Sequence, residues 1–337
     1  MNSPKVSVII PVYNAGHRLR SCIESILSQT LREIEIIFIL DCPKDGSDKV
    51  VLEYAAMDSR IIVIKNEKNL NTGKCRNLGI KTATGEYIAF SDHDDIVMPS
   101  MYEDMYIKAI ATNADIVLGV PEYCYPNQSK NKTYFYPKEG DVREKLLSCL
   151  IGRKKGDTDD WEFYYSHGVI WDNLYKSEMV KKNNINFIDN NIVTFEDNLF
   201  LIECLFKANK AVVHNQLVYK HTLESTNTAA TSAYSKSEKI LAYMDYLYNL
   251  LERERMLEKY FQNFSNSAAR YMISIITRII LSQRNTKGIS KEIKMIKESK
   301  HKEMIFNHTN YATLIKGSKT PLKKLAYTLI YSYLKWS

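Results

Sequence analysis

Three carboxylates follow one short apolar run in this chain. Asp92, Asp94 and Asp95, with His93 between them, come directly after Tyr87–Phe90. Ionised carboxylates at the mouth of a buried strand repel one another and lose hydration. A hard divalent cation such as Mg²⁺ or Mn²⁺ would relieve this repulsion and would bring a phosphate-bearing substrate with it. The alternative is a solvated turn in which Asp95 caps the next helix.

The elements that would position these residues alternate between strand and helix. Alternation at this pitch predicts an α/β fold with a parallel, doubly wound sheet, in which ligands bind beyond the carboxyl ends of the strands. Pro11–Tyr13, Asp41 and Asp92–Asp94 all fall at such ends. The predicted strands are 6–11, 34–40, 61–65 and 87–90, and the predicted helices between them are 17–29, 48–57 and 73–82. No G-x-G-x-x-G occurs, which argues against a nicotinamide dehydrogenase.

Bulk composition indicates a globular enzyme. The chain has 337 residues, of which 45% are hydrophobic and 25% charged, so it has an ample core and is not disordered. The six cysteines include no C-x-x-C pair, which favours reduced thiols over disulfides or a zinc site. The N-terminal apolar run is too short for a signal peptide, and no apolar stretch of about 20 residues occurs to span a bilayer. We therefore expect a cytoplasmic protein.

The formal charge of +7 is concentrated after residue 285. Basic segments of this kind bind nucleic acid or anionic membranes, or simply form a solubilising face.

Several segments closely resemble family 2 glycosyltransferases, which are nucleotide-sugar enzymes with the GT-A fold. That fold has a Rossmann-like, mostly parallel central sheet with helices on both faces. The segments that carry the resemblance are Val6–Asn14, Ser25–Thr30, Glu35–Asp41, Asn71–Gly79, Thr84–Asp95 and Phe195–Phe200. Their order and spacing follow the family over roughly residues 5 to 225. The resemblance implies a nucleotide-sugar-binding half at 1–110 and an acceptor-binding and catalytic half at 111–231. Beyond it, the spacing of apolar residues predicts a helical C-terminal region at 232–337.

The resemblance assigns three residues to the donor's base. Pro11 and Tyr13 end the first strand, where a backbone carbonyl and a flat ring would cradle the uracil of a UDP-sugar. Asp41 would accept a hydrogen bond from the uracil imide. The competing interpretation places Tyr13 in the core. Cys42–Ser47 departs from the family, which usually continues with a second Asp and Gly-Ser.

Arg76 and the acidic run would hold the rest of the donor. Arg76 would either neutralise phosphate or anchor a nearby acidic loop. By the resemblance, Asp92 contacts the ribose hydroxyls and Asp94 ligates a divalent metal through the diphosphate. Asp95 is expected to cap the next helix or orient its neighbours, and His93 is the variable middle residue.

Inverting transfer also needs a base that takes a proton from the acceptor hydroxyl. Asp197 resembles that base, at the start of a helix predicted over 198–208. The helix N-terminus is expected to keep Asp197 ionised. Glu196 is assigned to acceptor positioning or to support of the base. The alternative is that Glu196 and Asp197 only cap the helix.

His221 lies where some family members place a third metal ligand, and imidazole suits Mn²⁺ better than Mg²⁺. A structural histidine is the alternative. The Ser- and Thr-rich stretch 223–231 resembles a lid that orders on donor binding.

Aromatic residues gather at 161–171, between the two acidic sites. They would offer stacking faces to a sugar or, alternatively, pack in the core. Residues 167–172, with His167, Trp171 and Asp172 as the named contacts, are predicted to line the acceptor site. The processive Q-x-x-R-W signature is absent, which favours addition of one sugar per encounter.

The last segment is predicted to form an amphipathic helix. Thr320 and Pro321 are suitable N-cap and N1 residues. An apolar stripe follows, with lysines and aromatic residues beside it; it comprises Leu322, Leu325, Ala326, Leu329, Ile330, Tyr333 and Trp336. This composition suits a helix lying in the plane of an anionic membrane. Packing on its own domain or on the second subunit of a homodimer is the alternative.

Together these features predict a metal-dependent (Mn²⁺ or Mg²⁺), inverting glycosyltransferase. It would move a hexose or N-acetylhexosamine from a UDP-sugar to a glycan or lipid-linked oligosaccharide, in capsule, lipopolysaccharide or other surface-polysaccharide synthesis. We expect it at the inner face of the cell membrane, with no nucleic-acid partner. One rival is a sugar nucleotidyltransferase, but Pro11–Gly16 lacks the basic phosphate loop that it needs. The other is a non-catalytic membrane- or nucleic-acid-binding scaffold, against which Asp92, Asp94 and Asp197 argue.

Overall fold

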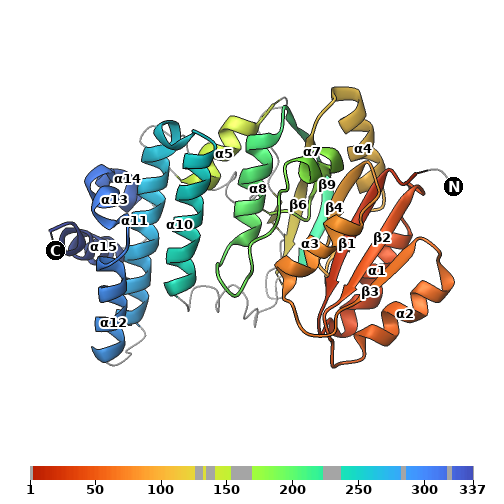
Figure 1. Ribbon diagram of the computed structural model, residues 1–337, viewed down its shortest axis with the longest axis horizontal. Helices are drawn as coiled ribbons and strands as arrows, with labels where there is room; N and C mark the ends of the chain where they lie inside the picture. The colour runs from red at the N-terminus through yellow and green to blue at the C-terminus, as the bar shows by residue number, and fades with distance from the viewer. Residues whose placement is uncertain are drawn as a thin grey trace. The chain divides into compact units, whose positions relative to one another are not determined.

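The computed structural model describes residues 3–125, 132–133, 141–152, 169–222, 237–281, 286–316 and 321–336. The chain divides into two compact units (Figure 1). Unit 1 comprises residues 1–144, 166–190 and 196–227, and unit 2 comprises residues 145–165, 191–195 and 228–337. The two halves predicted on either side of residue 110 share one sheet, because strands from both belong to it.

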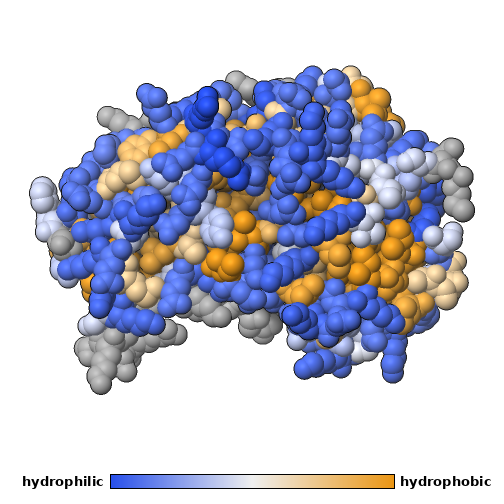
Figure 2. Space-filling model, in the orientation of Figure 1, coloured by the Kyte–Doolittle hydropathy of each residue, from blue (hydrophilic) through white to orange (hydrophobic). Residues whose placement is uncertain are grey.

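The first half of the sheet of unit 1 is parallel. Its strands run in the order β3-β2-β1-β4 and are β1 (Val6–Val12), β2 (Ile34–Leu40), β3 (Ile61–Lys65) and β4 (Tyr87–Phe90). Every residue of β1, β2 and β4 is buried, as in strands covered on both faces, whereas β3 is partly exposed at the edge. Apolar residues gather in the area of this half in Figure 2. The predicted bounds of β2, β3 and β4 are confirmed.

The second half makes the sheet mixed. β8 (Asn173–Lys176) runs antiparallel between β4 and β6 (Ile116–Cys124), and β6 pairs in parallel with β9 (Ala211–Thr222). β5 (Ile96–Val97) pairs antiparallel with the end of β9, and β7 (Lys132–Thr133) pairs with β6. The α/β class is confirmed. Because β5 follows the acidic run directly, its pairing brings that run beside the end of β9.

Helices flank the sheet where the alternation predicted them. α3 packs on β1 and β2, and a Cβ added to Gly79 of α3 would lie 2.3 Å from Cγ2 of Ile9. Gly79 is therefore needed for the close approach of helix and strand. The helices of unit 1 are η1 (Gly16–Arg18), α1 (Leu19–Leu27), α2 (Ser47–Met57), α3 (Thr72–Thr82), α4 (Met101–Thr112), α7 (Ser177–Lys182) and α8 (Glu196–Lys207), while α5 (Arg143–Ile151) crosses into unit 2.

Unit 2 is helical in its described residues, as expected for the C-terminal region. Its longest helix, α11 (Leu257–Leu281), contacts each of the other five that follow residue 236. Those are α10 (Ser237–Arg253), α12 (Thr286–Lys297), α13 (Lys302–His308), α14 (Tyr311–Lys316) and α15 (Pro321–Trp336). α15 begins at Pro321 as predicted, whereas Thr320 lies outside the described residues. In the part of the chain that the structure describes, every helix is too short or too polar to cross a bilayer.

Candidate active site

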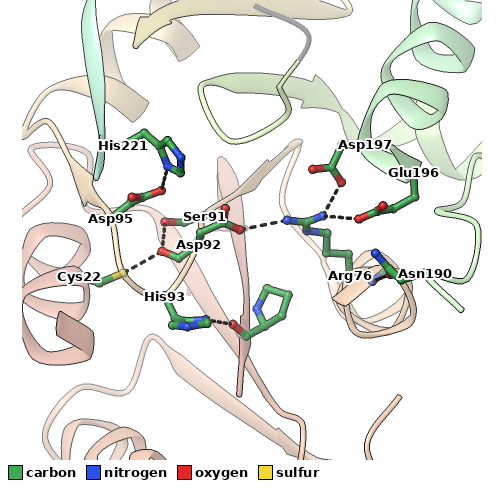
Figure 3. Close-up of polar contacts among 12 residues, drawn as sticks. Cys22, Arg76, Ser91, Asp92, His93, Asp95, Asn190, Glu196, Asp197 and His221 are labelled. Atoms are coloured by element: carbon green, nitrogen blue, oxygen red, sulfur yellow. Dashed lines mark hydrogen bonds and ion pairs between the residues drawn. The ribbon is translucent and has the colours of Figure 1, made fainter. Parts of the chain in front are cut away.

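Arg76 joins three carboxylates at the centre of the site (Figure 3). Its guanidinium is 3% exposed, and Nη2 donates to Oδ1 of Asp92 at 3.0 Å. Nη1 donates to Oδ1 of Asp197 at 2.5 Å and lies 3.7 Å from Oε1 of Glu196. A buried cation is stable only when it is paired in this way. The anchoring role, one of the two alternatives for Arg76, is what the structure shows; these four residues are called the Arg76 hub.

The position of Arg76 is fixed by the segment that follows α7. Asn77 exchanges two hydrogen bonds of 2.8 Å with the backbone of Phe187. The backbone N–H of Gly73 donates to Oδ1 of Asn190 at 2.7 Å, and Lys74 pairs with Asp189 at 2.5 Å. The first turns of α3 are therefore held at several points, which fixes the direction of the Arg76 side chain.

Aromatic packing fixes the helix that carries the carboxylates. Phe200 of α8 stacks on Phe187 with ring centroids 4.0 Å apart, and Phe90 of β4 meets both rings edge-on. The Arg76 guanidinium lies 5.3 Å from the Phe187 ring centroid. α8 begins at Glu196, two residues before its predicted start, so Asp197 lies within its first turn.

Asp197 has an unusual acidity. Burial of its carboxylate, opposed by Arg76 and reinforced by the charges of Glu196 and Asp92, raises the pKa of Asp197 to about 8. The helix N-terminus was expected to keep Asp197 ionised; desolvation, with the charges of Glu196 and Asp92, acts against it and outweighs Arg76. A side chain that is 32% exposed and titrates near neutrality is nevertheless well matched to general-base work.

The predicted uracil contacts have different surroundings. Tyr13 is 44% exposed, so the interpretation that places it in the core is wrong. Asp41 is buried and accepts hydrogen bonds from the backbone N–H groups of Leu70 and Asn71 and from Nδ2 of Asn66, at 2.7 to 3.0 Å. Asp41 thus organises the loop before α3.

Neighbouring loops complete this side of the site. The carbonyl of Pro11, expected beside the base, lies 3.1 Å from Nδ1 of His93. In the segment that departs from the family, Asp45 accepts hydrogen bonds from the backbone N–H of Gly16 and from the hydroxyl of Ser47. Asp45 therefore ties the altered loop to the end of β1.

Asp95 and His221 form a second contact of the acidic run. Asp95 is fully buried; one carboxylate oxygen lies 2.9 Å from Nδ1 of His221 and the other accepts from the backbone N–H of Thr222 at 3.0 Å. Asp95 does not cap α4, which begins at Met101. It orients a neighbour, the other expected role, because β5 and β9 pair. Burial lowers the pKa of His221, but the hydrogen bond and the charge of Asp95 outweigh it. The pKa of His221 is therefore raised.

A stacked column of rings supports this pair. Trp171 lies between Tyr219 and His221, with ring centroids 4.5 and 5.0 Å away. The Tyr219 hydroxyl accepts from the backbone N–H of Asp92 at 3.1 Å. Trp171 and Asp172 are 4% and 1% exposed, which favours packing over the predicted acceptor contact. His167, the lid 223–231 and most of the aromatic stretch lie outside the described residues.

The two residues predicted to ligate a divalent cation are Asp94 and His221. No group of three or more metal-ligating side chains occurs among the described residues. Mg²⁺ sites of the phosphate-bridged kind need only one or two protein ligands. The Nδ1 contact with Asp95 leaves Nε2 of His221 for a metal, the arrangement usual for metal-bound histidines. Nη1 of Arg18 lies 3.8 Å from Oδ2 of Asp94. This contact was not predicted from the sequence, in which the only indication is that a basic residue closes the short helix η1 after the first strand.

Comparisons with known proteins point to one family. Residues 7–174 match the model of the family described as glycosyl transferase family 2. The whole chain is 29% identical to the uncharacterized glycosyltransferase YibD of Escherichia coli K12, of which it covers 94%. Over 68% of its length it is 32% identical to the glycosyltransferase GlyG of Streptococcus pneumoniae TIGR4, of which it covers 74%.

A solved structure shows the same fold. Staphylococcus aureus TarS 1–349, in complex with UDP-GlcNAc, superposes with a TM-score of 0.70 over 98% of this chain and 89% of its own, at 19% identity. The rival interpretations as a nucleotidyltransferase or a non-catalytic scaffold are not supported by these relatives. Because its sequence matches this family and its fold matches that of TarS, the chain belongs to glycosyltransferase family 2 and is a glycosyltransferase.

Proposed function

We propose that this glycosyltransferase moves a hexose or N-acetylhexosamine from a UDP-sugar to a hydroxyl of a surface glycan or lipid-linked oligosaccharide, with inversion at the anomeric carbon. The observation that carries the proposal is the Arg76 hub. One guanidinium holds Asp197, the candidate base, and Asp92, the candidate ribose contact, in a fixed relation. We place the reaction at the cytoplasmic face of the membrane.

The chemistry is a single in-line displacement. Asp197 accepts the proton of the acceptor hydroxyl while that oxygen forms the new bond to the anomeric carbon. The bond from that carbon to the diphosphate breaks, and UDP leaves with the electron pair. Arg76 holds one oxygen of Asp197, so the carboxylate keeps its direction as it gains the proton. Glu196, on the same helical turn, would position the acceptor.

Donor recognition is assigned to the end of the parallel strands. Tyr13 is exposed there and offers a face to a base, while Asp41 holds the adjoining loop and keeps one lone pair for a uracil N–H. The UDP-GlcNAc in the TarS complex supports a UDP-sugar and makes UDP-GlcNAc the first donor to test.

Asp94 and His221 would hold the divalent cation. When bound, it would neutralise charge on the departing diphosphate. Asp95 would keep the His221 ring in the orientation that presents Nε2.

The test is a panel of nucleotide-sugars incubated with the protein and Mn²⁺. We expect one UDP-sugar to give UDP release and a thermal upshift, and proton NMR of the transferred sugar to show the inverted anomer. A retained anomer, or stabilisation by a guanosine or cytidine donor alone, would contradict the proposal. Calorimetry of UDP with and without Mn²⁺ should show a metal dependence that Asp94→Ala removes. Equal binding by that variant would exclude Asp94 as a ligand.

A further inference from the structure

An apolar stripe on α15 is left exposed in unit 2. Leu325, Leu329, Tyr333 and Trp336 are 56%, 62%, 49% and 82% exposed. Their spacing of four, four and three residues places them on one face of the helix. These four residues are called the α15 stripe.

The opposite face of α15 is packed in the core of unit 2. Tyr327, Ile330, Tyr331 and Leu334 are all less than 10% exposed. The hydroxyls of Tyr327 and Ser274 on α11 lie 2.7 Å apart. The alternative expectation, packing on its own domain, thus holds for one face only. A helix held this firmly presents the α15 stripe as a fixed surface.

Three lysines flank the α15 stripe. Nζ of Lys297, at the end of α12, lies 4.7 Å from the Tyr333 ring centroid. Lys324 is exposed on the first turns of α15, and Lys335 lies next to Trp336 near its end. The sequence of α15 contains no Asp or Glu. Apolar groups flanked by lysines fit a surface that is apolar below and anionic above.

We propose that the α15 stripe docks on an anionic phospholipid membrane, with α15 lying in the plane of the interface. Leu325 and Leu329 would enter the acyl boundary, while Tyr333 and Trp336 would sit at headgroup depth, where amphipathic rings are stable. With 16 residues, α15 is shorter than the roughly 20 that a span requires.

The charges favour lipid over a second copy of this chain. A two-fold interface places the same patch against itself. The α15 stripe would then bring Lys297, Lys324 and Lys335 of one copy close to those of the other, and like charges oppose such contact. Anionic headgroups instead attract each lysine near the surface.

The experiment is co-sedimentation of the full chain with vesicles of phosphatidylcholine alone or with 30% phosphatidylglycerol. We expect binding to the anionic vesicles only, weakened by salt. Leu329→Glu should bind roughly ten- to hundredfold more weakly, from the lost burial of one leucine. Ile107→Glu is the matched control, because Ile107 on α4 is 59% exposed and outside the stripe; it should bind as the parent does.

A second readout reports depth directly. Brominated acyl chains should quench Trp336, and the quenching should fall sharply in Trp336→Phe, which keeps an apolar ring; Trp171, which is buried, should not respond. Failure of the parent chain to bind anionic vesicles would overturn the proposal, as would equal losses in Leu329→Glu and Ile107→Glu. A parent chain that is dimeric by light scattering, without vesicle binding, and becomes monomeric in Leu329→Glu would assign the stripe to a second copy instead. None of these readouts depends on the donor or on activity.

Discussion

The two ends of the acidic run are held by different kinds of cation. At one end Asp92 pairs with Arg76, which stays charged at all accessible pH values. At the other end Asp95 meets His221, an imidazole whose pKa is lowered by burial but raised on balance by the Asp95 carboxylate. Both links cross long stretches of sequence, since Arg76 also binds Asp197 and His221 comes from β9. The second link is called the Asp95–His221 pair.

The difference lies in the balance of charge. The hub places one cation among three carboxylates, and the remaining negative charge, together with burial, raises the pKa of Asp197. The pair matches one carboxylate to one imidazole, and its second carboxylate oxygen is satisfied by a backbone N–H. An unbalanced cluster suits a group that must take up a proton. A balanced pair suits a group that must keep its direction.

Replacing the proposed base should have the largest effect. Asp197→Asn keeps the shape and removes the proton acceptor, so kcat should fall by about 10²- to 10⁴-fold with donor binding retained. Initial rates of UDP release would measure kcat, and calorimetry with UDP would measure donor binding. Near-normal rates in a folded Asp197→Asn variant would show that the base lies elsewhere.

Removing the cation of the hub should rank next. Arg76→Met leaves three partly exposed carboxylates without their buried cation, and the free energy of unfolding should fall by up to about 3–5 kcal/mol, the cost of breaking a buried pair. The matched control is Arg20→Met, because Arg20 also makes two contacts with a carboxylate, that of Glu53, but at the surface. An exposed pair contributes little to stability, so this variant should unfold nearly as the parent does. Urea unfolding compares the two variants, and equal losses would mean that the burial of Arg76 adds nothing.

Local elements of this site were predictable, and the long-range contacts were not. The bounds of β2 and β4 follow from apolar runs that end in polar residues, so Asp41 and Asp92 could be placed at strand ends from the sequence alone. The hub needs Arg76 and Asp197, 121 positions apart, to meet. Their meeting depends on the packing of Phe187, Phe200 and Phe90, which no local periodicity reports.

The burial of Trp171 was hidden for a similar reason. An aromatic-rich segment fits a sugar-binding floor as well as a core. The choice is decided by β8, which enters between β4 and β6 antiparallel to both. The alternation of strands and helices before residue 100 predicts parallel strands and gives no sign of this insertion. Trp171, which lies just before β8, is therefore buried at the end of the sheet, where it stacks on Tyr219 and His221.

Breaking the balanced pair should cost less than breaking the hub. Asp95→Asn keeps a hydrogen-bond partner for His221 but removes its charge, and metal affinity should fall by about 10- to 100-fold. Mn²⁺ titration of the UDP complex by calorimetry measures this change. Asp45→Asn is a useful control, since Asp45 organises a loop through hydrogen bonds without touching His221. Unchanged Mn²⁺ affinity in Asp95→Asn would remove His221 from the metal site.

The smallest effect that separates the two regions is a pH dependence. With a pKa of about 8, the ionised fraction of Asp197 rises from about one tenth at pH 7 to about nine tenths at pH 9, so kcat/KM should rise about tenfold.

Stability should move the opposite way. The native state holds a proton that the unfolded chain, with its ordinary carboxyl pKa, has already released. This contribution is complete below the unfolded pKa and is lost as pH rises through 8, so Tm should fall over the interval in which activity rises. Asp197→Asn should remove this fall of Tm with pH. If Tm falls with pH equally in the parent and in Asp197→Asn, then Asp197 does not hold the proton in the native state.

Arg76→Lys keeps the positive charge but loses the two-pronged guanidinium. The rise of kcat/KM with pH should then shift to higher pH, because a weaker partner lowers the pKa of Asp197 less.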